Sequence, residues 1–325
     1  MTGLSDSFHR PINYLRLSVT DRCNFHCSYC QPAGGASYLV RSHLLSYEEI
    51  VTVVEAVAGL GVNMVRLTGG EPLVRRGLSR LVGMLAAIPG IDDLSLTTNG
   101  LLLSRYALSL RRAGLRRVNV SLDTLRPERF REIAGREGLS EVLRGLERAR
   151  QVGLDPVKVN TVVMGGVNDD EILDFGRLTI DRGWHVRFIE LMPFGRADGA
   201  QFMPVAEVAR VLGALGGMEP FFQKDGAGPA KYFRFPGAEG TVGFIGAVSD
   251  HFCFGCNRLR LTADGKLRPC LMGDEMMDLR PVLRSGASVE EVREVIRHAA
   301  ALKPEGHRLA HGVGPTDTTM SHIGG

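Results

Sequence analysis

Short β-branched segments alternate with amphipathic helical patterns through the first two thirds of this 325-residue chain. Such alternation is typical of βαβ units, in which parallel strands form one sheet and helices cover it. The sequence predicts six strands, which begin at Leu15, Val62, Asp93, Arg117, Pro156 and His185. The fold class is therefore α/β, and six units suit either a partial barrel or a doubly wound sheet.

Helix boundaries between these strands support the same interpretation. Ser46 and Glu49 form a capping box before an apolar run, and Gly61 follows where that helix is expected to end. Ser104 and Ser140 are expected to cap two later helices.

The regular alternation ends near Pro204, and a Gly-rich segment at 224–246 predicts loops and short antiparallel strands. We therefore expect two units, residues 1–205 and residues 206–325. A last helix is predicted at 288–302. Taken by itself, the terminal pair Gly324 and Gly325 would be a frayed end.

Polar, cysteine and glycine residues gather where the predicted strands end. In barrels and open parallel sheets alike, ligands bind at the carboxyl ends of the strands. The residues at these ends are Cys23 to Cys30, Gly69 to Glu71, Thr97 to Asn99, Ser121 with Asp123, and Met192. The sequence therefore predicts an enzyme site at this edge.

Four predicted strands carry a cation between apolar residues, although strands covered on both faces are usually apolar throughout. Leaving one such charge buried and unpaired costs about 3–5 kcal/mol. Each side chain either reaches water or pairs with a carboxylate such as Glu190, or the four converge on a polyanion. Convergence predicts a nucleoside triphosphate pocket, because arginine binds phosphate through two parallel hydrogen bonds. The four cations are Arg16, Arg66, Lys158 and Arg187.

Bulk composition excludes some classes of protein. The net charge is +3, from 39 basic and 36 acidic residues, so nothing in it predicts binding to nucleic acid or to a membrane surface. No apolar run reaches the roughly 18 residues of a membrane span, and the start lacks a signal-peptide pattern. We expect a cytoplasmic protein, in which six cysteines indicate metal or redox chemistry rather than disulfides.

The cysteines form two groups of three. Cys23, Cys27 and Cys30, the first trio, have C-x3-C-x2-C spacing. A zinc site is the alternative, but no fourth cysteine or histidine lies at a finger-like distance, and His26 is expected to be an exposed loop residue. Three thiolates on a four-iron cluster would leave one iron open to a small molecule.

The second trio is Cys253, Cys256 and Cys270, which again offers three thiolates and no fourth. From spacing alone, a zinc ribbon completed by a distant histidine such as His251 is as good an interpretation as an iron–sulfur cluster.

The first trio and the stretch "TGGEP" together resemble the radical S-adenosylmethionine (SAM) superfamily. Its CxxxCxxC motif follows the first strand, with an aromatic residue, here Tyr29, before the last cysteine. The resemblance implies that the amino and carboxylate groups of SAM occupy the open iron. It also implies that the backbone at Gly69 and Gly70 approaches the amino group.

The stretches "CNRLRLT", "GKLRPCL", "RFIELMPFG" and the terminal "IGG" resemble the GTP 3',8-cyclase family, from about Arg10 to Gly325. The resemblance implies a partial (β/α)6 TIM-like barrel and a C-terminal region with a second cluster. It implies a lyase that converts GTP to 3',8-cyclo-7,8-dihydro-GTP through a 5'-deoxyadenosyl radical. That reaction is the first step of molybdenum cofactor (molybdopterin) biosynthesis.

Residue roles follow from the same resemblance. Two 4Fe–4S clusters are expected, the first on the first trio and the second, which binds guanine, on the second trio. The residues expected to hold SAM are Tyr29, Gly70, Ser121, Asn160 and Met192. Those expected to hold GTP are Arg16, Arg66, Thr97, Lys158, Arg258, Leu259 and Arg260. Arg187, Gly324 and Gly325 are expected to act in catalysis, the glycines as a tail that enters the site.

Two positions depart from the family pattern: Met64 stands where a lysine is expected, and Gly165 where an arginine is common. The family also implies an electron donor such as flavodoxin or ferredoxin, a downstream cyclic pyranopterin monophosphate synthase, and a homodimer. Two other hypotheses stay open at this point. One is a radical SAM enzyme that acts on a peptide, and the other is a protein with two structural zinc sites.

Overall fold

The computed structural model describes residues 3–30, 38–194, 200–222, 228–307, 309 and 320–323. Twelve strands form one sheet in the order β12-β11-β10-β1-β2-β3-β4-β5-β6-β9-β8-β7. The strands are β1 (Tyr14–Ser18), β2 (Met64–Thr68), β3 (Asp93–Thr98), β4 (Arg117–Ser121), β5 (Val157–Val163), β6 (His185–Glu190), β7 (Glu219–Pro220), β8 (Lys231–Arg234), β9 (Thr241–Ile245), β10 (Arg258–Leu261), β11 (Lys266–Arg268) and β12 (Met277–Asp278).

All six predicted strands are present as β1 to β6, and they pair in sequence order as parallel neighbours. The parallel run continues into the C-terminal region, because β10 pairs with β1 and β9 pairs with β6. Antiparallel strands end the sheet on each side, β11 and β12 beyond β10, β8 and β7 beyond β9. The expected partial barrel is confirmed, and it is not closed.

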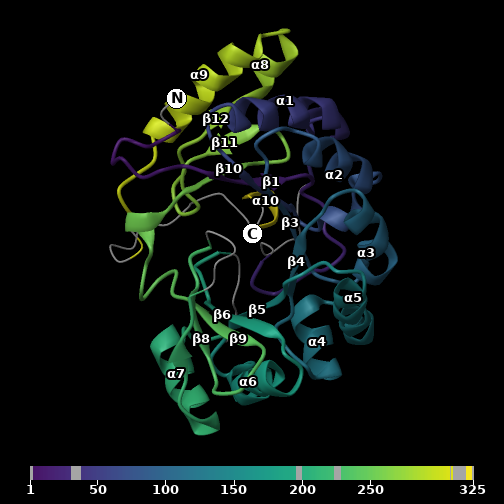
Figure 1. Ribbon diagram of the computed structural model, residues 1–325, viewed down its shortest axis with the longest axis vertical. Helices are drawn as coiled ribbons and strands as arrows, with labels where there is room; N and C mark the ends of the chain where they lie inside the picture. Colours follow the sequence, from purple (N-terminus) through teal and green to yellow (C-terminus); the bar gives the residue numbers. More distant parts are fainter. Residues whose placement is uncertain are drawn as a thin grey trace.

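Helices lie outside the curved sheet, while the short helix α10 lies inside it (Figure 1). The capping box of Ser46 and Glu49 is confirmed at the start of α1. The other two predicted caps are wrong, because Leu102 precedes α3 and Gly138 precedes α5. The helices are α1 (Tyr47–Ala58), α2 (Leu78–Ala86), α3 (Leu103–Arg112), α4 (Pro127–Ala134), α5 (Leu139–Gln151), α6 (Ile172–Asp181), α7 (Val205–Leu212), α8 (Arg280–Arg284), α9 (Val289–Ala301) and α10 (Met320–Ile323).

Side-chain alternation along each strand separates the core from the interior of the barrel. On β1, Leu15 and Leu17 belong to the main hydrophobic cluster, whereas Tyr14 and Arg16 line an internal cavity. On β2, Val65 and Leu67 are likewise core residues and Arg66 lines the cavity. The cations that interrupt these strands therefore face inward, away from the helices.

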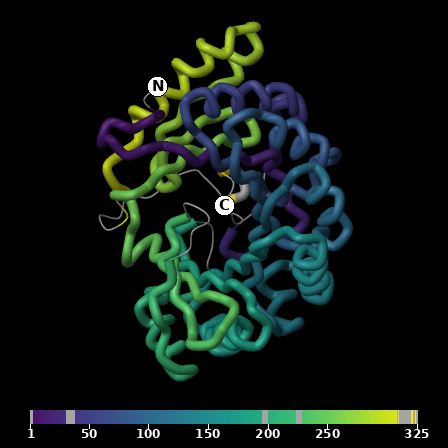
Figure 2. Tube along the Cα trace, viewed as in Figure 1, coloured from purple at the N-terminus to yellow at the C-terminus, as the bar shows by residue number. Residues whose placement is uncertain are grey.

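The N-terminal end of the described chain lies on the outside of the molecule near α9, whereas its C-terminal end, α10, lies inside the sheet (Figure 1). The N-terminal segment runs next to the C-terminal end of α9 (Figure 2), where the Ser7 hydroxyl donates a hydrogen bond of 2.7 Å to the Ala301 carbonyl. This contact holds the N-terminal segment against α9. None of the helices in the described ranges is both long and apolar enough to cross a membrane.

Candidate active site

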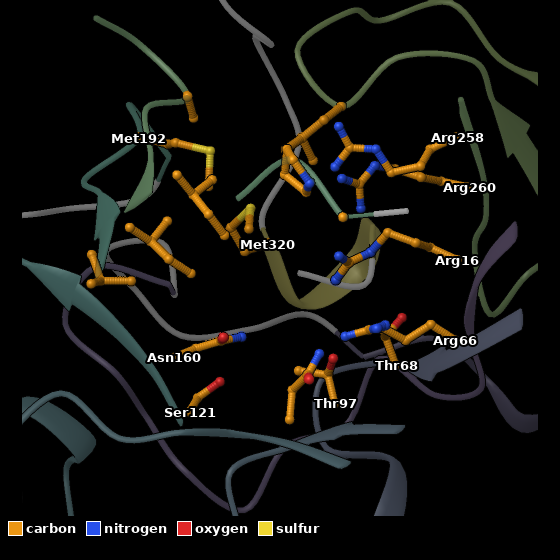
Figure 3. Close-up of a pocket in the computed structure, with 18 of the residues that line it drawn as sticks. Arg16, Arg66, Thr68, Thr97, Ser121, Asn160, Met192, Arg258, Arg260 and Met320 are labelled. Atoms are coloured by element: carbon orange, nitrogen blue, oxygen red, sulfur yellow. The ribbon is translucent and has the colours of Figure 1, made fainter. Parts of the chain in front are cut away.

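A cavity of about 300 Å³ lies inside the partial barrel, at the carboxyl ends of the parallel strands. Both cysteine trios contribute to its walls, although 222 residues separate Cys30 from Cys253 in the numbering. Figure 3 shows arginines from β1, β2 and β10 directed into this space. The predicted residues that line it are Arg16, Tyr29, Arg66, Gly70, Thr97, Ser121, Asn160, Arg187, Met192, Arg258, Arg260 and the six cysteines.

The glycines of "TGGEP" let two stretches of backbone touch beside the first trio. The Gly70 amide donates to the Thr20 carbonyl at 2.8 Å, and the Glu71 amide donates to the Arg22 carbonyl at 2.8 Å. A Cβ at Gly70 would lie 2.6 Å from the carbonyl oxygens of both Asp21 and Arg22. Only glycine allows this approach, which sets the start of the cysteine loop.

Glu71 is a fully buried carboxylate that holds the end of β3 against this loop. It accepts hydrogen bonds from the Thr98 hydroxyl at 2.8 Å and from the Asn99 amide at 2.7 Å. The Asn99 side chain in turn donates to Asn24 Oδ1 at 2.7 Å and lies 4.0 Å from Cys23 Sγ. Burial raises the pKa of Glu71 to about 7. Sequence reasoning marked Glu71 and Asn99 only as strand-end residues and missed this supporting role.

The residues expected to hold SAM come together at one part of the cavity. Figure 3 shows Ser121, Asn160 and Met192 around the same space. The Tyr29 hydroxyl donates to Asp123 at 2.7 Å, and Asp123 also accepts from the Val162 amide at 2.8 Å. Burial raises the pKa of Asp123 to about 6. Asp123 was not predicted as a site residue, although its place at the end of β4 was the available signal.

Three arginines form a row because the strands that carry them pair in register. Arg16 is opposite Arg260 on β10 and opposite Arg66 on β2. We call Arg260, Arg16 and Arg66 the arginine row. Burial, and then the charge of Arg260, lower the pKa of Arg16 well below its usual value. Burial and Arg258 lower the pKa of Arg260 to about 10.

Tyr14 lies among these cations, and the pKa of its phenol reflects their combined charge. Burial raises the pKa of the Tyr14 phenol, but the charges of Arg66, Arg16 and Arg258 outweigh burial and leave the pKa lowered. Arg66 also lies over the Tyr14 ring, at 5.7 Å from its centre. A site that favours a phenolate also favours phosphate oxygens.

Arg187 is buried in β6 and is not paired with Glu190. Glu190 instead accepts hydrogen bonds from the amides of Val205 at 2.9 Å and Val248 at 2.8 Å. Among the described residues, Nε and Nη2 of Arg187 have no hydrogen-bond partner. Its neighbour on β9 is Gly243, and the absence of a side chain there leaves room for Arg187, because a Cβ added at Gly243 would lie 2.8 Å from Arg187 Cγ. The carboxylate alternative is therefore wrong for this cation.

Two predicted GTP contacts do not line the cavity. Leu259 alternates with Arg258 and Arg260, so its side chain packs in the hydrophobic core. The Lys158 ammonium lies 3.2 Å from the Tyr232 hydroxyl and 5.1 Å from the centre of its ring. The strand pattern that correctly placed Arg16 and Arg66 therefore does not place Lys158 at the cavity wall.

The charge of Lys158 affects the pKa of His185, and the stability of the protein should therefore depend on pH. Burial, and then Lys158, lower the pKa of His185 to about 4. Because the unfolded chain gains this proton near pH 6.5 and the folded chain does not, stability is lost as the pH falls from about 6.5 to about 4. We expect a loss on the order of 2–3 kcal/mol.

Urea unfolding measured across this pH range tests the expectation. His185→Gln should flatten the pH dependence, and substitution of the exposed His26 by glutamine is the matched control. An unchanged slope in His185→Gln would show that another group is responsible.

The second trio lies on a turn and on the segment before β12. The Cys256 amide donates to the Cys253 carbonyl at 3.1 Å. Burial raises the pKa of Cys256, but Arg258 and Lys303 outweigh burial and lower it to about 7. By contrast, burial raises the pKa of Cys23 to about 11. Lys303, which sequence reasoning missed, also lines the cavity.

Each trio offers three free thiols that open on the cavity, as a cluster with one open iron requires. Within the described ranges, no three His, Cys, Asp or Glu side chains converge as a site for a single metal ion. His251 lines the cavity and its ring lies 5.2 Å from that of His307. The donors present therefore fit an iron–sulfur cluster at each trio.

Four further positions were singled out in the sequence, two at the C-terminus and two that depart from the family pattern. Gly324 and Gly325 lie outside the described residues. Met64 is buried in β2 and does not line the cavity. Gly165 forms an isolated bridge with Gln201, through backbone hydrogen bonds of 2.8 and 2.9 Å.

Comparison with known proteins agrees with this geometry. Residues 17–179 match the family model of the radical SAM superfamily, and residues 184–309 match the model named Molybdenum Cofactor Synthesis C. The GTP 3',8-cyclase of Pelotomaculum thermopropionicum is 51% identical, over 99% of this chain and 100% of the relative. The chain belongs to the GTP 3',8-cyclase family. The enzyme of Moorella thermoacetica is 48% identical, over 99% of this chain and 100% of that relative.

Solved structures share the fold at low sequence identity. Streptococcus suis SuiB bound to precursor peptide SuiA has a TM-score of 0.65 and 13% identity, over 93% of this chain and 73% of that chain. SuiB in a second structure has a TM-score of 0.63 and 13% identity, over 97% of this chain and 77% of that chain. At this identity the likeness shows the fold alone.

Proposed function

We propose that this protein converts GTP to 3',8-cyclo-7,8-dihydro-GTP, the first step of molybdenum cofactor biosynthesis, with SAM and two 4Fe–4S clusters. One observation carries the proposal: both open cysteine trios and five arginines line the same cavity. Family membership supplies the reaction. The first cluster and SAM, when bound, supply the 5'-deoxyadenosyl radical that removes hydrogen from the ribose 3' carbon of GTP.

The protein's own residues then bind and orient both molecules. The Gly70 backbone, Tyr29, Ser121, Asn160 and Met192 hold SAM next to the first trio. Thr97 and the cations hold GTP, with Arg16, Arg66, Arg258 and Arg260 on its phosphates. Each arginine presents a planar fork of donors, which suits phosphate oxygens. Lys158 and Leu259 belong to the same predicted set, although neither side chain lines the cavity.

The remaining parts of the proposal extend beyond the cavity. Residues 1–205 form the radical SAM unit and residues 206–325 the unit that carries the second trio. Arg187 acts in catalysis together with Gly324 and Gly325. The protein is a cytoplasmic homodimer that receives electrons from a flavodoxin or ferredoxin and passes its product to cyclic pyranopterin monophosphate synthase.

Anaerobic turnover tests the proposal. Reconstituted, reduced protein incubated with SAM and GTP should form 5'-deoxyadenosine and a cyclised nucleotide, and should contain about eight irons per chain. The Cys27→Ser variant is the control and should form neither product. Two zincs per chain would support the structural-zinc hypothesis. SAM cleavage that requires a peptide and ignores GTP would support a peptide-modifying enzyme.

A further inference from the structure

Lys303 is a buried lysine that joins the segments carrying the second trio. It lies two residues after the end of α9, and 4% of its surface is exposed. Its ammonium donates to the Arg258 carbonyl at 2.8 Å and to the Pro269 carbonyl at 2.6 Å. These carbonyls belong to the residue two positions after Cys256 and to the residue just before Cys270.

Lys303 also lines the cavity, together with Cys256 and Cys270. An ammonium has three N–H groups, and two of them are used on carbonyls. The third N–H group is therefore available to the side of the cavity that these two cysteines line. Burial lowers the pKa of Lys303, and the nearby Cys256 and Cys270 thiolates oppose that shift. A buried cation normally requires a compensating anion, and here the cysteines supply it.

Arg10 contacts the same region in a different way. It donates to the Cys253 carbonyl at 2.7 Å, and to the carbonyls of Pro304 at 2.5 Å and Glu305 at 2.6 Å. Its charge is balanced by Asp6 at 2.6 Å. Arg10 therefore fixes backbone and has a carboxylate partner of its own, whereas the charge of Lys303 lies at the cavity wall that Cys256 and Cys270 also line.

We propose that Lys303 is a positioning residue of the second trio whose N–H groups and charge raise the reduction potential of the group bound there. The inference rests on the proposed function, because it assumes a cluster on the second trio. Hydrogen bonds to ligand sulfurs and nearby charge are the protein's main means of setting such potentials. A positive charge favours the reduced state, which carries one more electron.

Reductive titration of the full-length holoprotein, followed by electron paramagnetic resonance, tests this role without measuring turnover. Lys303→Gln should keep about eight irons per chain and lower one of two midpoint potentials. We expect at least a tenfold fall in the reduced-to-oxidised ratio at fixed potential, or about 59 mV for one electron. Lys303→Arg, which keeps the charge, should recover most of the shift.

Lys266→Gln is the matched control, because Lys266 is a partly exposed lysine of the neighbouring β11 that pairs with Asp264 at 3.3 Å. It should leave both potentials unchanged. Full iron content with unchanged potentials in Lys303→Gln would overturn the proposal, as would equal iron loss in Lys303→Gln and Lys303→Arg. Iron loss in Lys303→Gln alone would also overturn it, because Lys303 would then hold the trio together rather than set its potential. A wild-type protein without iron would instead contradict the proposed function.

Discussion

Arg187→Met is expected to stabilise the ligand-free protein while removing most of its affinity for GTP. Burial lowers the pKa of Arg187, and the charge of Arg66 lowers it further. In the described part of the chain, two of its three guanidinium nitrogens have no hydrogen-bond partner. Methionine has similar length and no charge, so its burial avoids that cost. We expect a gain of about 2 kcal/mol in unfolding free energy.

The same change should weaken GTP binding about 10- to 100-fold, because a hydrogen bond to a charged group contributes about 1.5–3 kcal/mol. Thermal unfolding of apoprotein and equilibrium binding of GTP measure the two effects separately. Arg177→Met is the matched control, since Arg177 is exposed on α6 and pairs with Asp174 at 3.1 Å. A destabilised variant with unchanged GTP affinity would show that Arg187 serves the fold.

The cations that face the interior of the barrel could be predicted from the sequence, because a charged side chain within an apolar strand must reach water, a carboxylate or an anionic ligand. Their arrangement could not be predicted, since it depends on register between distant strands. Arg260 lies beside Arg16 only because β10 pairs with β1, across more than 200 residues of sequence. Lys158 alternates with core residues in the same way, but it does not line the cavity, and its ammonium lies 3.2 Å from the Tyr232 hydroxyl of β8.

Supporting residues were harder to predict than the residues they support. Cysteines at motif spacing are recognisable in the sequence, but Lys303 is a single lysine after a helix, where a solvated end is the usual outcome. Its role depends on carbonyls of Arg258 and Pro269 that only the folded chain brings together. Ser104 and Ser140 failed as helix caps because α3 and α5 begin before them, at Leu103 and Leu139.

Gly70→Ala should abolish iron binding at the first trio and leave the second trio loaded. The added Cβ would lie 2.6 Å from two backbone oxygens of the segment that leads into Cys23. Backbone cannot rotate away as a side chain can, so the cysteine loop must move. Overpacking of this kind costs about 1–3 kcal/mol. The moved loop would also lose the hydrogen bond between the Gly70 amide and the Thr20 carbonyl.

Iron content, together with thermal unfolding of the apoprotein, measures this effect. The variant should retain about four of about eight irons per chain, because the second trio lies on a separate segment. Gly83→Ala, in α2, is the matched control, since its Cβ would meet only the Ala113 carbonyl at 4.0 Å. That control should gain about 0.5–1 kcal/mol from helix propensity. Full iron loading in Gly70→Ala would mean that the close backbone contact does not set the position of the first trio.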